Sequence, residues 1–161
     1  MALKAENVRS CLTIVFMALL SATLAMAQTE PPKQPPPQQS AFDAQTASHL
    51  LRQLSEALQG QSQKKFLALF DLSRMKDSAL FKQQIASFFS QITAIRVHLN
   101  LGETAVEGDR ATIAVDAQME AEPGNGGPIA RRNDRLNFTV ASAGGTWKFI
   151  ELQPRSFFSL P

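Results

Sequence analysis

Several side-chain types that catalysis often uses are scarce in this sequence of 161 residues. It contains no tyrosine, one tryptophan, two histidines and one cysteine, Cys11. A lone cysteine cannot form an intramolecular disulfide or a multi-thiolate metal site. The sequence also has no G-x-S-x-G elbow, no phosphate-binding glycine loop and no H-E-x-x-H motif. These absences argue against the common hydrolase, nucleotide-binding and zinc-protease classes, and we predict neither a metal nor a cofactor.

An excess of charge of one sign is also missing. The formal net charge is +2 at pH 7. Without residues 1–27, 14 basic residues stand against 13 acidic ones. Proteins that bind nucleic acid or anionic membranes usually carry a clear basic excess, so we expect neither as a partner.

The only long apolar run lies at the N-terminus. A basic start precedes "CLTIVFMALLSATLAMA", which ends in the small-x-small triplet Ala25–Ala27. This order is typical of a signal peptide, and we predict a signal over residues 1–27 with cleavage between Ala27 and Gln28. A retained anchor is the alternative, but the run of about 14 to 17 residues is short for the roughly 20 that a spanning helix needs. We therefore expect export to the periplasm or the extracellular space, without stable membrane insertion after cleavage.

A proline-rich segment follows the predicted signal. Residues 28–40, "QTEPPKQPPPQQS", contain five prolines in 13 positions. Proline fixes φ and lacks an amide donor, so we predict an extended, disordered linker. Recognition by a proline-binding partner is the alternative. Residues 41–161 then remain for one domain with a single core, and this domain has no cysteine because Cys11 lies in the signal.

Apolar residues recur at helical spacing in the first half of this domain. Ser40 is predicted to cap the first helix, with Asp43 as the acidic half of a capping box, and Gly60 is predicted to end it. Ser62 and Asp77 are predicted to begin a short second helix and a third. The buried stripes are expected at Ala47, Leu50, Leu51, Leu54 and Leu58, then at Phe66, Leu67 and Phe70, and then at Phe81, Ile85, Phe88, Phe89 and Ile92.

From Ile95 onward the apolar period becomes two residues, which predicts strands. The first strand continues directly from the third helix, and a turn at Gly108–Asp109 leads to the second. A loop is expected at residues 122–128, a third strand around residues 135–140, and a turn at Gly144–Gly145 before the last strand, "TWKFIEL". This order predicts an α+β domain in which three N-terminal helices pack on an antiparallel sheet of about four strands.

Four segments carry a resemblance to a known fold: "ALQGQSQKKFLALF", the helix-to-strand join at residues 88–99, "VEGDRATIAV" and "GGTWKFIEL". In this order they resemble the NTF2-like superfamily, the group of nuclear transport factor 2, SnoaL and ketosteroid isomerase, over about residues 41–158. The resemblance implies a strongly curved, cone-shaped sheet around the helices, a small-molecule pocket at the mouth of the cone and, commonly, dimerisation through the sheet. The tyrosine donor of the steroid isomerases has no counterpart here, so steroid isomerisation is not expected.

The interior candidates are side chains expected to face the helices. Packing as core is their simplest interpretation, and an apolar cavity for an uncharged ligand is the alternative. The only acid–base groups nominated there are His49 and Glu151. For His49 the simpler interpretation is a position on the exposed flank of the first helix, near Arg52 and Glu56. The candidate pocket residues are His49, Phe88, Phe89, Met119, Phe138, Trp147, Phe149 and Glu151.

The exterior candidates lie on the polar face of the predicted sheet. They are Arg96, His98, Asn100, Asp116, Gln118, Arg135 and Asn137. A solvated surface is the simplest interpretation, and a polar homodimer interface is the second. A catalytic pair of His98 and Asp116 is the third, and it is disfavoured because an open face excludes no water.

No catalytic constellation accompanies the fold pattern. The leading hypothesis is therefore an exported, non-catalytic binding or assembly module that forms a homodimer. The alternative is a small enzyme or carrier that uses the cone pocket for an apolar small molecule. At the C-terminus, Phe157, Phe158 and Leu160 would form an apolar patch if they were left free. We expect them to fold back across the helices or the cone mouth, with docking on a partner chain as the alternative.

Overall fold

Three α-helices precede four antiparallel strands in residues 42–159, the part of the chain that the computed structural model describes. The helices are α1 (Ala44–Gln59), α2 (Gln63–Ala68) and α3 (Ser78–Gln91). The strands are β1 (Ile92–Glu107), β2 (Arg110–Pro123), β3 (Ala130–Ala143) and β4 (Thr146–Gln153), and a 3-10 turn, η1 (Arg155–Phe158), follows them. The predicted signal (1–27) and linker (28–40) lie outside the described residues.

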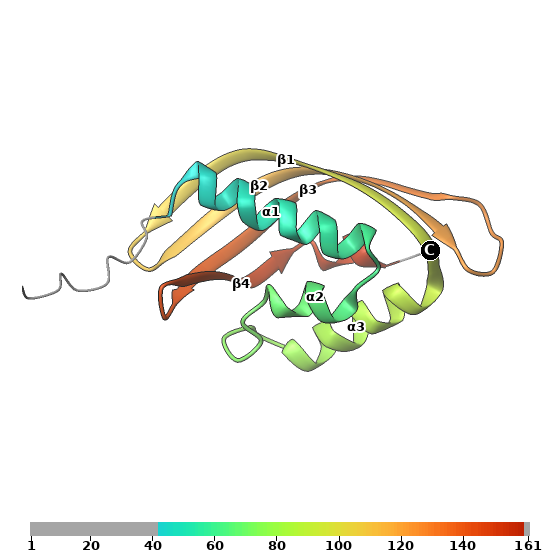
Figure 1. Cartoon of the computed structure of the whole chain (residues 1–161), viewed down its shortest axis with the longest axis horizontal. Helices are drawn as coiled ribbons and strands as arrows, with labels where there is room; N and C mark the ends of the chain where they lie inside the picture. The colour runs from blue at the N-terminus through green and yellow to red at the C-terminus, as the bar shows by residue number, and fades with distance from the viewer. Residues whose placement is uncertain (1–41, 160–161) are drawn as a thin grey trace, which may run out of the picture. The chain divides into compact units, whose positions relative to one another are not determined.

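The four strands form one sheet in the order β1-β2-β3-β4. Tight turns at residues 108–109 and 144–145 join two of the neighbouring pairs, and such turns require antiparallel pairing. Figure 1 shows the helices on one face of this sheet, with the long strands β1 and β2 bending over α1. The predicted α+β class, with three helices against a curved antiparallel sheet, is confirmed.

The second and third helices start at the predicted positions, but α1 starts three residues later than the predicted cap at Ser40 would place it. Asp43 is itself the N-cap of α1, and its carboxylate accepts a hydrogen bond of 2.7 Å from the backbone N–H of Thr46. The prediction of Ser40 as the cap is therefore wrong, because a carboxylate at position 43 already satisfies a free amide of the first turn. Ser62 caps α2 as predicted. Asp77 precedes α3 in a left-handed conformation and makes no side-chain cap.

The join between α3 and β1 has no connecting loop. The helix ends at Gln91 and the strand begins at Ile92, three residues earlier than the change of period at Ile95 indicated. Ile92 is buried on either assignment, which is why a buried stripe alone could not locate the boundary. The backbone N–H of Gly124, just after β2, donates to the carbonyl of Gln91 at 2.8 Å. This bond ties the end of the helix to the far end of the β1–β2 pair.

Aromatic rings fill the space between the helices and the sheet. Phe158 of η1 lies 5.5 Å from Phe66 and 5.6 Å from Phe88, measured between ring centroids. Both Phe157 and Phe158 are buried, so the expected folding back of the C-terminal segment is confirmed for these two residues. Leu160 lies outside the described residues. Within residues 42–159 the buried set is entirely apolar, with no polar or charged side chain in it.

Candidate outer-face site

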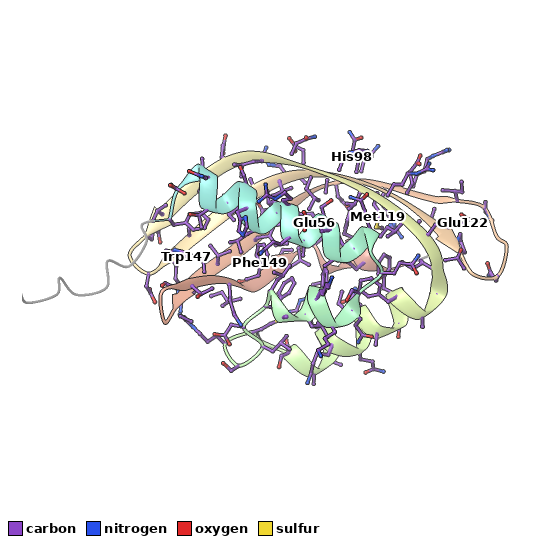
Figure 2. All side chains as sticks on the ribbon, viewed as in Figure 1. Glu56, His98, Met119, Glu122, Trp147 and Phe149 are labelled. Carbon is purple, nitrogen blue, oxygen red and sulfur yellow. The ribbon has the colours of Figure 1, made fainter. Side chains whose placement is uncertain are left out.

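The seven predicted exterior residues do come together on the face of the sheet that points away from the helices, here called the outer face. The register pairs His98 with Gln118, and Asn100 with Asp116. Asp116 in turn pairs with Arg135 on β3. In Figure 2, His98 projects from the sheet on the side opposite the helices. The seven side chains are Arg96, His98, Asn100, Asp116, Gln118, Arg135 and Asn137, and all are exposed.

Glu120 is the electrostatic centre of the outer face. Its carboxylate accepts a hydrogen bond of 2.9 Å from Nε of Arg131 and lies 3.9 Å from Nη1 of Arg96. The hydrogen bond from Arg131, followed by the charge of that guanidinium, holds the pKa of Glu120 below its ordinary value. A second bridge joins Arg135 to Glu103 at 3.7 Å. These pairs are exposed, so each adds little to folding stability.

Three charged residues of this face were not among the predicted site residues: Glu120, Arg131 and Glu103. The alternation through Asp116 and Gln118 does predict Glu120 on this face, but alternation alone gives no reason to single it out. Arg131 lay outside the predicted third strand, because glycine and proline around residues 122–128 masked the early start of β3 at Ala130. Glu103 lies within an irregularity of β1 between Leu101 and Thr104, and alternation could not assign its face.

The outer face carries a hollow near His98. A hollow of about 370 Å³ is lined by Arg96, His98, Gln118, Met119, Glu120, Arg131 and Asn133. The register places Gln118, rather than Asp116, directly opposite His98. A general base works best when its carboxylate partner orients it and water is excluded. The predicted catalytic pair of His98 and Asp116 is therefore not made of directly opposed residues.

The predicted pocket residues are mostly the packed core itself. Phe88, Met119, Phe138 and Phe149 are each at most 2% exposed, and the rings of Phe138 and Phe149 are 4.9 Å apart. Phe89 is half-buried at the edge of this cluster. Figure 2 shows Phe149 between the sheet and the helices. These rings pack against one another.

Two of the predicted pocket residues, His49 and Trp147, do share a hollow. It has a volume of about 320 Å³ and lies between α1, the end of α2 and the start of β4. Nδ1 of His49 lies 2.8 Å from a guanidinium nitrogen of Arg52 on the exposed flank of α1. His49 is therefore tied to the charged helix surface, as the flank interpretation expected.

Glu151 does not face the helices, and its nomination as an inward carboxylate is wrong. Thr139 pairs with Glu151, whereas the next residue, Val140, pairs with Phe149. Ile150 is thus an extra residue in β4, a β-bulge, which reverses the alternation beyond it. Glu151 is exposed and accepts a hydrogen bond of 2.9 Å from the side-chain amide of Gln153.

Nowhere in residues 42–159 do three or more histidine, aspartate or glutamate side chains gather as a metal ion would require. None of the helices in the same range combines the length and the apolar character that a membrane crossing needs.

Comparisons with known proteins are informative at the level of structure. No protein-family model and no curated protein matches the sequence. An NTF2-like superfamily protein from Salmonella enterica matches with a TM-score of 0.60 and 10% identity, over 67% of this chain and 86% of that chain. A protein from Novosphingobium aromaticivorans, provisionally named a scytalone dehydratase, matches with a TM-score of 0.61 and 14% identity, over 67% and 79%. A protein with a cystatin-like fold from Caulobacter vibrioides matches with a TM-score of 0.55 and 15% identity, over 70% of this chain and 92% of that chain.

The class of protein follows from this geometry: an α+β domain whose curved antiparallel sheet packs around helices on one face. The particular fold is NTF2-like. The resemblance drawn from the sequence is therefore confirmed as a fold. Identities of 10% to 15% to these structures carry no information about activity.

Proposed function

We propose that this chain is an exported, non-catalytic assembly module that forms a homodimer through the outer face. One observation carries the proposal. All buried residues among 42–159 are apolar, whereas the outer face carries a group of six charged side chains: Arg96, Glu103, Asp116, Glu120, Arg131 and Arg135. An interior without acid or base supplies no proton transfer, and a broad polar face supplies a surface for association.

The arrangement of charge on the outer face supports self-association. The middle strand, β2, contributes the acids Asp116 and Glu120, and the strands beside it contribute arginines: Arg96 from β1, and Arg131 and Arg135 from β3. Two copies that cross face to face would set the acidic row of each against arginine rows of the other. A two-fold interface of this kind is self-complementary, as isologous dimers require.

The test is the mass of the chain beginning at Gln28, measured by sedimentation over a range of concentrations. We expect a dimer that weakens as salt is added. Asp116→Arg should shift it to monomer, because the acidic row is then interrupted. The matched control is Lys82→Glu, also a charge reversal on an exposed residue but on α3, which should leave the dimer intact. An unchanged dimer in Asp116→Arg would contradict the outer-face interface.

A carrier or small enzyme for an apolar molecule is the second candidate. The hollow that contains His49 and Trp147 favours it, as does the shared fold of a protein provisionally named a dehydratase. Native mass spectrometry of the exported chain separates the two proposals. A reproducible extra mass would support a ligand, and a dimer without extra mass would support the assembly module.

A further inference from the structure

The two edges of the sheet differ in how the chain covers them. On β4, the backbone N–H of Phe149 donates to the carbonyl of Leu69 at 3.0 Å, and the N–H of Asp71 donates to the carbonyl of Phe149 at 2.8 Å. The segment after α2 thus pairs with the edge of β4. The other edge strand, β1, spans 16 residues and pairs only with β2 among the described residues. An open edge of this length presents a row of backbone donors and acceptors to another strand.

A groove follows the open edge. It has a volume of about 610 Å³ and lies between α1 and the stretch of β1 from Val97 to Leu101. The wall on α1 is made by Ser48, Leu51, Arg52, Ser55, Glu56 and Gln59. A groove with a strand edge on one side and a helix on the other accepts an extended chain, which pairs with the strand and places alternate side chains against the helix.

Two leucines mark the part of β1 where an added strand would bury most apolar surface. Ile95 and Val97 are buried beneath the helices, but Leu99 and Leu101 are only half-buried. Both leucines point to the helix side of the sheet, and both line the groove. A second apolar strand beside them would complete their burial.

The charge of β1 is divided along its length. The first half carries Arg96 and His98, and the second half carries Glu103 and Glu107. A parallel copy of β1 would set like charges together, whereas an antiparallel copy sets the basic half against the acidic half. The strand is therefore complementary to a second, antiparallel copy of itself.

We propose that the open edge of β1 is a strand-addition site for a second copy of this chain, with the two-fold axis at Asn100. In this register Leu99 lies opposite Leu101 of the second copy, and both point inward. The irregularity of β1 after Leu101 leaves Glu103 on the outer face, which places Glu103 of the second copy near His98 and Arg96. The two sheets join into one continuous sheet of eight strands. The pairing uses the backbone edge of β1 rather than the face of the sheet, so the inference goes beyond the proposed function and does not depend on it, although Arg96, His98 and Asn100 also belong to the outer face.

The first test uses the chain from Gln28, which contains no cysteine. Asn100 lies on the proposed axis, where directly opposed strand residues have the Cα separation that a disulfide spans. Under mild oxidation Asn100→Cys should form a disulfide-linked dimer. The matched control is Asn137→Cys, another exposed asparagine on the same face but on β3. A cross-link at position 137 without one at position 100 would overturn the edge and support the outer-face dimer instead. No cross-link at position 100 would also overturn the edge.

The second test uses charge reversal and mixing, followed by sedimentation. Arg96→Glu and Glu103→Arg should each weaken self-association by about tenfold, because each places like charges together twice across the axis. A mixture of the two variants should recover association, since one of the two contacts is then reversed in sign and the other is native. Recovery on mixing cannot come from a folding defect. Loss of the exposed bridges to Glu120 and Arg135 costs little stability, and thermal melting checks this.

Two results would overturn the proposal. Either Arg96→Glu and Glu103→Arg both associate as strongly as the native chain, or they associate more weakly and a mixture of the two does not recover association. Lys148→Glu on β4 is the control for charge alone and should associate like the native chain. If Asp116→Arg abolishes association while both β1 variants retain it, the outer face is the interface and the β1 edge is not. If a peptide from another protein occupies the edge, the native chain alone stays monomeric, and the inference fails.

Discussion

Phe158, near the end of the chain, lies edge-on to Phe66 of α2, with ring centroids 5.5 Å apart. The contact closes the core, because η1 follows the last strand and brings Phe158 against α2 and α3. Polar bonds hold the segment in place: the side-chain amide of Gln84 donates to the carbonyl of Arg155 at 2.7 Å, and a guanidinium nitrogen of Arg132 donates to the carbonyl of Ser159 at 2.7 Å. The C-terminal segment is therefore part of the core.

Replacing Phe158 with alanine should lower the free energy of unfolding by about 3 to 5 kcal/mol, the usual cost of emptying a buried phenylalanine site. Urea unfolding measures this change. Leu80→Ala is the control, since Leu80 is 66% exposed and should change stability by no more than about 0.5 kcal/mol. Deletion of residues 156–161 should lower the melting temperature. If the melting temperature is unchanged and association is lost, these phenylalanines serve a partner chain rather than the core.

The spacing of apolar residues predicted the helices and strands of this fold, because each element buries one face and its apolar residues therefore recur with the period of that element. The helix stripe at Leu50, Leu54 and Leu58 and the alternation on β2 each reflect one buried face, so the residues alone identify helix and strand. The ends of the elements were harder to predict. Ile92 would be buried in a helix or in a strand, so its burial does not locate the boundary. The sequence offered both Ser40 and Asp43 as caps of α1, and only the hydrogen bond from Thr46 shows that Asp43 is the cap.

The sequence predicted which face of the sheet the site residues share, but not which of them contact one another. Alternation alone places Arg96 and Asp116 on the outer face, but the register between strands decides that Glu120 lies between two arginines. Register depends on pairing between distant segments and on irregularities such as the bulge at Ile150. That one extra residue is the reason Glu151 points outward, and nothing in the order of apolar residues reveals it.

The stability of the domain should fall in acid partly through Asp43. The hydrogen bond from the Thr46 amide lowers the pKa of Asp43 below 3.8. A carboxyl whose pKa is lower in the folded state stabilises that state above the unfolded pKa, and the contribution is lost as pH falls through the folded value. Asp43→Asn keeps a capping oxygen but cannot titrate. The difference in unfolding free energy between the two proteins should be constant at neutral pH and should shrink below pH 3.8.

Urea unfolding at a series of pH values measures this difference. Asp71 and Glu120 also have lowered pKa values, but both are present in the two proteins and cancel. A difference that stays constant down to the lowest pH would mean that the cap does not favour the charged form of Asp43.

Arg131→Ala should raise the pKa of Glu120 towards its ordinary value. The hydrogen bond from Arg131 is the largest cause of the lowered pKa, and the more distant Arg96 is a smaller one. Carboxyl carbon shifts in an NMR titration would follow Glu120 directly. Asp71, whose pKa is lowered by the hydroxyl of Ser73, is an internal control and should titrate as before. An unchanged Glu120 pKa would place Arg131 away from the carboxylate in solution.

Gly102→Ala should destabilise the domain through a close backbone contact within the sheet. A Cβ at position 102 would lie 3.0 Å from the carbonyl oxygen of Ala114 on β2. Backbone of a paired strand cannot easily move aside, so we expect a loss of about 1 to 3 kcal/mol, as for other overpacked sites. Gly124→Ala is the matched control, because its Cβ would meet neighbours only at 3.6 and 3.7 Å, an ordinary contact distance. If urea unfolding shows both variants to be equally stable, β1 and β2 are further apart near Gly102 than this geometry requires, and the irregularity after Leu101 is looser than its register indicates.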